Sequence, residues 1–82
     1  MMILYSTEGC HLCEEAYVLL TQLGVSDQVS IVDIAFDEAL FSRYGVTIPV
    51  LKLENKDAEL NWPFDLATLT DWLDKHGISN DQ

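Results

Sequence analysis

The feature that most constrains the fold is the alternation of strand and helix patterns over the first 34 residues. Residues 2–6 are a short apolar run, which predicts a strand buried on both faces. Residues 11–23 carry apolar side chains at helical spacing, and Gly24 ends that pattern. The apolar positions of this predicted helix are Leu12, Ala16, Leu19, Leu20 and Leu23. Residues 29–34 are mostly β-branched, which predicts a second strand. A strand, a helix and a strand in this order predict a parallel pair joined by a right-handed crossover.

The second half of the chain predicts two further strands and two further helices. Residues 37–44 have acidic residues at the start, as a short helix does. Residues 49–53 predict a strand with proline first, and residues 58–62 alternate in polarity as a half-exposed strand does. Asp65 can cap a last helix over residues 66–76. The inward positions of that helix are Leu66, Leu69 and Leu73.

The element order β-α-β-α-β-β-α predicts an α/β fold with a four-stranded mixed sheet and helices on both faces. We expect a single domain over residues 1–82, because 82 residues bury only a thin core. Residues 79–82 are expected to fray.

The charge balance excludes several classes of partner. The chain has 14 acidic and four basic residues, for a net charge of −10. Such a surface repels phosphate, so we expect no nucleic-acid partner and no anionic membrane surface. No basic leader and no apolar stretch of roughly 20 residues is present, so we expect a cytoplasmic protein.

Two cysteines lie between the first predicted strand and the first predicted helix, in the segment Cys10-His11-Leu12-Cys13. Their spacing brings both side chains to one face of a helical turn, close enough for a disulfide. The free N–H groups of a helix N-terminus favour a thiolate on Cys10. Cys13, one turn further in, would be more buried and could resolve a mixed disulfide. The pattern favours thiol–disulfide exchange.

Two other interpretations of the cysteines remain open. They can be small buried hydrophobic residues, or half of a zinc site. A zinc site needs two more ligands. His11 and His76 are the only histidines, there is no second cysteine pair, and the site would need His76 or carboxylates from elsewhere in the chain. We therefore expect no metal.

Thr47-Ile48-Pro49 stands just ahead of the third predicted strand, and an X–Pro bond is where a cis peptide has a modest cost. With Leu4-Tyr5-Ser6, the cysteine pair and the last helix, this segment resembles glutaredoxins of the thioredoxin-fold superfamily. The chain is most similar to a bacterial glutaredoxin-like group with Cys-x-Leu-Cys and Trp-Pro-Phe-Asp segments. The resemblance implies that Cys10 is the nucleophile and Cys13 the resolving thiol. It also implies a cis Pro49 facing them, with Thr47 and Ile48 binding the substrate and Ile48 pairing with it by main chain.

Three departures from glutaredoxins concern glutathione. His11-Leu12 replaces Pro-Tyr, residues 61–65 replace a glycine-rich segment, and acidic residues flank the cysteines. These acidic residues are Glu8, Glu14 and Glu15. Asp65 can still meet an amino group, and Arg43 and Lys52 are the basic candidates for a glutathione carboxylate. A protonated His11 would tune the Cys10 thiol.

Two functions follow from these patterns. The first is a monomeric dithiol oxidoreductase that acts on a protein or small-molecule disulfide, binds no cofactor and uses glutathione weakly if at all. The second is a redox-inert binding module of the same fold, whose acidic face recruits a basic partner.

Overall fold

The computed structural model describes residues 1–78 and bears out the expected order of elements. The strands are β1 (Met2–Ser6), β2 (Val29–Asp33), β3 (Val50–Leu53) and β4 (Glu59–Asn61). The helices are α1 (His11–Gln22), α2 (Glu38–Tyr44) and α3 (Leu66–Lys75), and a short 3-10 turn, η1 (Ser26–Gln28), precedes β2. The expected fraying of residues 79–82 lies outside the described residues. No helix within residues 1–78 has the length and apolarity needed to cross a membrane.

The four strands form one mixed sheet in the order β2-β1-β3-β4. β1 and β2 run parallel, with Met2 opposite Val29, as a right-handed crossover through α1 requires. β3 is antiparallel to β1 and pairs Val50 with Tyr5, and β4 continues antiparallel beside β3. The two central strands are the most apolar because both of their faces are covered.

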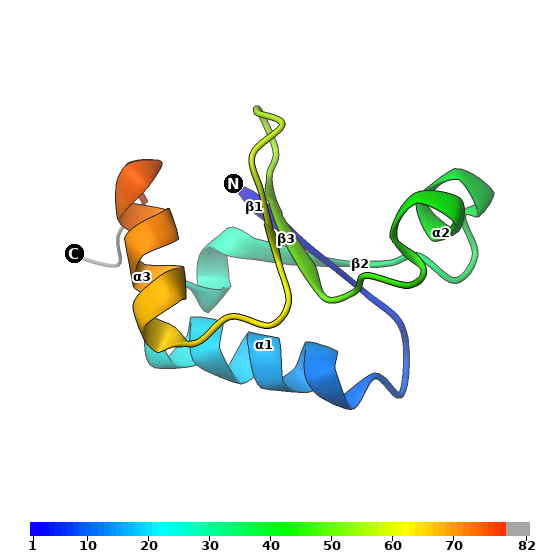
Figure 1. Ribbon diagram of the computed structural model, residues 1–82, viewed down its shortest axis with the longest axis horizontal. Helices are drawn as coiled ribbons and strands as arrows, with labels where there is room; N and C mark the ends of the chain where they lie inside the picture. The colour runs from blue at the N-terminus through cyan, green and yellow to red at the C-terminus, as the bar shows by residue number, and fades with distance from the viewer. Residues whose placement is uncertain (79–82) are drawn as a thin grey trace.

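Helices cover both faces of the sheet, and each face has its own core (Figure 1). α1 and α3 pack on one face, where alternate residues of β1 and β3 meet the inward stripes of both helices. This core contains Met2, Leu4, Leu51 and Leu53 from the sheet and Ala16, Leu20, Leu69 and Leu73 from the helices. The opposite core under α2 is smaller and is formed by Tyr5, Ile34, Tyr44 and Val50.

The inward faces of α1 and α3 differ in part from expectation. Leu12 is 45% exposed and Leu66 is 39% exposed, whereas Cys13 and Trp72 are buried. Both leucines lie in the first turn of their helix. On α1 the neighbouring Cys13 is buried in place of Leu12, whereas on α3 the first buried residue is Leu69. The inward stripe of α1 runs through Cys13, Ala16 and Leu20, at helical spacing.

The helix ends follow local chemistry. Asp65 Oδ1 accepts the Thr68 N–H at 2.8 Å and caps α3, and Asp37 caps α2 in the same way. α1 ends in a Schellman motif, in which the Val25 N–H donates to the Leu20 carbonyl at 3.1 Å. Gly24 has φ +76°, a conformation that favours glycine, so it stops α1 as predicted.

The topology brings four connecting segments to one end of the sheet. β1 and β2 end there, β3 begins there, and β4 ends there beside the start of β3. The Ile34 N–H donates to the Ser6 carbonyl at 3.0 Å, which holds two of these segments together. Residues 7–10, 34–37, 45–49 and 62–65 therefore gather at this end, which includes the cysteine pair.

Candidate active site

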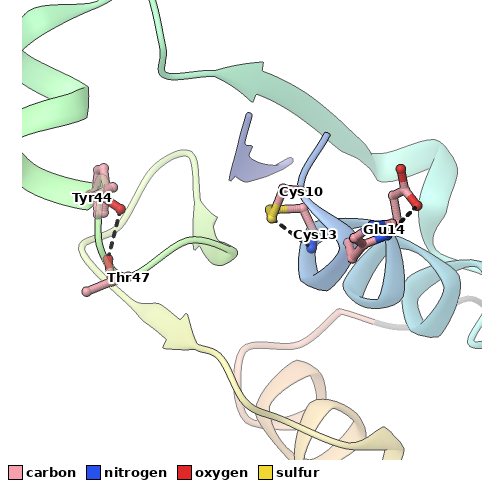
Figure 2. Close-up of a disulfide and its surroundings, with 6 residues drawn as sticks. Cys10, Cys13, Glu14, Tyr44 and Thr47 are labelled. Atoms are coloured by element: carbon pink, nitrogen blue, oxygen red, sulfur yellow. Dashed lines mark hydrogen bonds and ion pairs between the residues drawn. A yellow bond between two sulfur atoms is a disulfide. The ribbon is translucent and has the colours of Figure 1, made fainter. Parts of the chain in front are cut away.

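Cys10 is the N-cap residue of α1 and Cys13 lies in its first turn. The Cys13 N–H donates to Cys10 Sγ at 3.2 Å (Figure 2). The two sulfurs form a disulfide, with their Cα atoms 5.2 Å apart. Cys13 is 5% exposed, whereas Cys10 is only partly buried. The arrangement presents one accessible sulfur at a helix N-terminus and one protected sulfur behind it.

The loop before α1 places Cys10 at the helix start. β1 ends at Ser6, and the Cys10 N–H then donates to the Thr7 carbonyl at 3.3 Å. Gly9 closes this turn with φ +80°, which a residue with a side chain rarely adopts. The strand, the turn and the helix thus fix the position of Cys10 at the start of α1.

The segment Thr47-Ile48-Pro49 lies at the same end of the sheet. Because Val50 pairs with Tyr5, Pro49 sits one position beyond this pair, beside the end of β1. Pro49 is fully buried and the Ile48–Pro49 peptide bond is cis. The Tyr44 carbonyl accepts the N–H groups of Thr47 and Ile48, at 2.9 and 3.1 Å, and the Thr47 hydroxyl (Figure 2). The last residue of α2 therefore shapes this segment.

Tyr44 is itself anchored from three sides, a cluster that the sequence interpretation did not identify. Its ring stacks on Tyr5 with centroids 4.4 Å apart, and its hydroxyl donates to Glu59 Oε2 on β4. Burial first, and then the bond to Glu59, raises the pKa of Tyr44 to about 12. Arg43 lies over the Tyr44 ring at 5.4 Å and within 3.8 Å of Glu59. The sequence gives one indication of this cluster, which is that Tyr44 stands shortly before the Thr47-Ile48-Pro49 segment.

The basic residues considered for glutathione contact other groups. Arg43 pairs with Glu59, as described above. Lys52 Nζ donates to the carbonyls of Leu53 and Lys56, both at 2.9 Å, at the turn between β3 and β4. That turn is at the opposite end of the sheet from Cys10, so the structure does not bring Lys52 to the candidate site.

Acidic side chains surround the start of α1. The His11 side chain is 91% exposed, and its Nδ1 lies 3.9 Å from Glu14 Oε1. The imidazole therefore faces solvent and a carboxylate one turn along α1. Within residues 1–78 no group of three or more His, Cys, Asp or Glu side chains is arranged to hold a metal ion.

The segment that replaces the glycine-rich stretch is packed rather than open. Trp62 and Phe64 meet edge to face with ring centroids 5.0 Å apart, and Phe64 is 6% exposed. The Trp62–Pro63 bond is also cis, which the sequence did not indicate. Asp65 follows, and the Thr68 N–H that it accepts lowers the pKa of its carboxyl. The segment lies across from α1 and leaves a groove between them, which the sequence interpretation missed. The available signal was Trp62 with Pro63, for which the sequence leaves two interpretations, a packed edge of the core or, slightly less favoured, a substrate platform.

Comparison with known proteins decides the family. The family model described as Glutaredoxin-like domain (DUF836) matches residues 1–74. This chain belongs to that glutaredoxin-like family. No curated protein matches the chain.

Several solved structures are similar to this chain. Protein XcR50 from X. campestris is 40% identical, with a TM-score of 0.82 over 92% of this chain and 97% of that one. Protein Ne2328 from Nitrosomonas europaea is 30% identical, with a TM-score of 0.64 over 87% of each chain. Thioredoxin 1 from Thermosipho africanus is 10% identical, with a TM-score of 0.64 over 92% of this chain and 91% of that one. That likeness shows the fold alone: this glutaredoxin-like chain has the thioredoxin fold.

Proposed function

We propose that this glutaredoxin-like protein is a thiol–disulfide oxidoreductase in which Cys10 is the nucleophile and Cys13 the resolving thiol. The observation that carries the proposal is Cys10 Sγ at the N-cap of α1, accepting the Cys13 N–H while bonded to the buried Cys13. In the reduced protein that N–H and the helix N-terminus would stabilise a thiolate on Cys10. An accessible thiolate with a protected partner is what disulfide exchange requires.

The proposed reaction has two exchange steps. The Cys10 thiolate attacks one sulfur of a substrate disulfide, which breaks the substrate S–S bond and releases one substrate thiol after protonation. A mixed disulfide between Cys10 and the substrate remains. The Cys13 thiol then loses its proton and attacks Cys10 Sγ, which releases the second substrate thiol and leaves Cys10–Cys13 oxidised. Two electrons pass to the substrate, and a separate dithiol or thiol donor restores the reduced pair.

The segment Thr47-Ile48-Pro49 is the proposed substrate-binding strand. The Ile48 N–H already donates to the Tyr44 carbonyl. Main-chain pairing with a substrate would therefore draw on the Ile48 carbonyl as acceptor. The Thr47 residue is exposed beside this segment, and its hydroxyl donates to the Tyr44 carbonyl.

We infer that glutathione is at most a weak co-substrate. Arg43 and Lys52 are held by other groups, and Glu14 lies beside the start of α1. A net anionic tripeptide meets repulsion there instead of a cationic clamp. The proposed substrate is therefore a disulfide of a protein or of a small neutral molecule, and the proposed setting is a monomer in a reducing cytoplasm.

The proposal is tested with the wild type, Cys10→Ser and Cys13→Ser, using a small neutral disulfide and dithiothreitol as the donor. The wild type should catalyse exchange, and Cys10→Ser should lose it. In a separate reaction without dithiothreitol, which would reduce the product, reduced Cys13→Ser should form a stable mixed disulfide between Cys10 and the substrate, visible by mass spectrometry. Thermal melts of all three proteins control for folding. Exchange by Cys10→Ser at the wild-type rate would show that the roles are wrong.

The acidic surroundings of α1 also favour a second candidate, a redox-inert module that recruits a basic partner through this face. In that case a partner would bind equally well to the wild type and to a Cys10→Ser/Cys13→Ser variant, and the wild type would show no exchange with any disulfide.

A further inference from the structure

A groove of about 620 Å³ runs along one side of α1, between that helix and the segment of residues 62–65. On α1 the lining extends from His11 to Gln22. Twelve helical residues span about 16 Å, which matches roughly five residues of extended polypeptide. The groove is therefore long enough for a stretch of chain rather than a single side chain.

The floor of the groove is apolar. It is formed by Val18 and Leu19 on α1 and by Trp62 and Phe64 across from them. Val18 is 52% exposed, although it lies on a helix whose other outward residues are largely polar. Trp62 is only partly buried and packs edge to face on Phe64. An apolar side chain placed here would remove exposed hydrocarbon and an aromatic ring from water.

The rim of the groove is acidic. Glu14 and Glu15 line it from α1, and Asp65 lines it from the start of α3. Among the lining residues within 1–78, His11 is the only one that can carry a positive charge, and it already faces Glu14. The first 42 residues contain no lysine or arginine, so α1 carries no permanent positive charge beside these carboxylates. The rim complements a cation and repels an anion.

The groove lies beside the turn of α1 that follows Cys10 and contains Cys13. Neither cysteine lines the groove, but both line an adjoining hollow that shares Glu14 and Val18 with it. His11 lies between Cys10 and Cys13 in the sequence and lines the groove. Glu14, which donates its N–H to the Cys10 carbonyl, lines it as well. A chain segment lying in the groove would therefore end beside the hollow that Cys10 lines.

We propose that this groove binds a basic polypeptide segment of the substrate, with an apolar side chain on the floor and lysine or arginine at the rim. The inference rests on the proposed oxidoreductase function and names its substrate class: protein disulfides flanked by basic residues. The occupant is a polypeptide because the groove is elongated, and basic because the rim is acidic.

Binding is tested apart from redox chemistry with the Cys10→Ser/Cys13→Ser variant. The probes are two five-residue peptides without cysteine or tryptophan, one alternating lysine with leucine and one alternating glutamate with leucine. At low salt the basic peptide should change the tryptophan fluorescence, and Trp62→Phe should remove that change. The acidic peptide should not bind. Equal binding of both peptides, or binding of hexylamine as tightly as the basic peptide, would overturn the proposal.

Two matched double variants separate the groove from net charge. Glu14→Gln/Glu15→Gln should weaken binding of the basic peptide about fivefold at low salt, as two partly screened ion pairs would. Asp57→Asn/Asp74→Asn changes the net charge equally, on the β3–β4 turn and the last turn of α3. It should leave binding unchanged. Equal weakening by both double variants would show a non-specific charge effect and contradict the groove.

Exchange kinetics then distinguish this inference from the proposed function. For this measurement each peptide carries one added cysteine in a mixed disulfide with a small neutral thiol. The wild type should reduce the disulfide of the basic peptide faster than that of the acidic peptide, and Glu14→Gln/Glu15→Gln should lower the ratio of these two rates about fivefold. Reduction of a small neutral disulfide without any peptide preference would refute the groove and leave the function standing. A lack of exchange with every disulfide would refute the function, while the binding experiment would still decide the groove.

Discussion

Cys10 has two roles in the structure, because its sulfur caps α1 and is also the atom proposed to react. Serine is a good N-cap residue, so Cys10→Ser keeps an acceptor for the Cys13 N–H. A loss of exchange in that variant therefore reports on the nucleophile rather than on an unravelled helix. The Cys13 side chain neither caps α1 nor faces solvent, because it is buried against the core.

At the scale of single residues, Asp65 predicts a pH-dependent contribution to stability. The Thr68 N–H lowers the pKa of its carboxyl in the folded protein, so the ionised form is favoured by folding. This contribution is present above the carboxyl's usual pKa, near 4, and is lost as the pH falls through the lower folded value. Asp65→Ala should lower the melting temperature at pH 7 and have less effect near pH 3. Asp65→Asn, which keeps a capping oxygen, is the matched control. An equal effect of Asp65→Ala at both pH values would contradict the charged cap.

At the scale of elements, α2 is held mainly through Tyr44. α2 has only seven residues, and the core beneath it is small. Tyr44 stacks on β1 through Tyr5, reaches β4 through Glu59, and supports the segment of residues 47–49 through its carbonyl. Tyr44 thereby links α2 to β1 and β4, the two strands that flank β3, and to the proposed substrate-binding strand.

This arrangement predicts the effect of Tyr44→Phe, which removes the bond to Glu59 but keeps the ring stack and the carbonyl. The free energy of unfolding at pH 7 should fall by about 1 kcal/mol. Because the folded pKa of Tyr44 is about 12, against 10 in the unfolded chain, its contribution is complete below pH 10 and is lost as the pH rises to 12. Urea unfolding at pH 7 and pH 11.5 measures both effects, with Tyr17→Phe as the control. A difference between wild type and Tyr44→Phe that grows with pH would be inconsistent with this account.

The helices also show how far a pattern of apolar residues predicts packing. The existence and limits of α1 and α3 were predictable from their caps and periodicity. Which residues of the first turn face inward was not, so Leu12 and Leu66 were placed in the core and Trp72 was left unassigned. Adjacent residues on a helix differ by about 100° in direction, and only the position of the sheet selects between them.

At the scale of the molecule, the net charge of −10 is confined to a particle of 36 × 25 × 20 Å. Unfolding separates these charges, so repulsion works against the folded state at low ionic strength. Raising NaCl from about 10 mM to 500 mM shortens the Debye length from about 30 Å to a few ångströms. The few exposed ion pairs that salt also weakens contribute little.

We therefore expect NaCl to stabilise the protein over this range. A gain of about 1 kcal/mol would raise the melting temperature by roughly 4–8 °C for a domain of this size. Circular dichroism melts in NaCl and in an uncharged osmolyte at equal osmolality measure the difference, because the osmolyte does not screen charge. A melting temperature that falls with NaCl would show that attractive pairs dominate instead.

The sequence by itself determined the order of elements, their caps and the place of the cysteine pair between β1 and α1. These depend on residues a few positions apart, whose backbone preferences and hydrogen bonds are local. Only the tertiary structure decided that Tyr44 meets Glu59, that Lys52 lies away from Cys10, and that α1 and residues 62–65 enclose an acidic groove. Each of these facts requires segments far apart in the chain to pack at a particular angle and register. Periodicity fixes neither the angle nor the register, because both depend on how side chains from different elements fill the space between them.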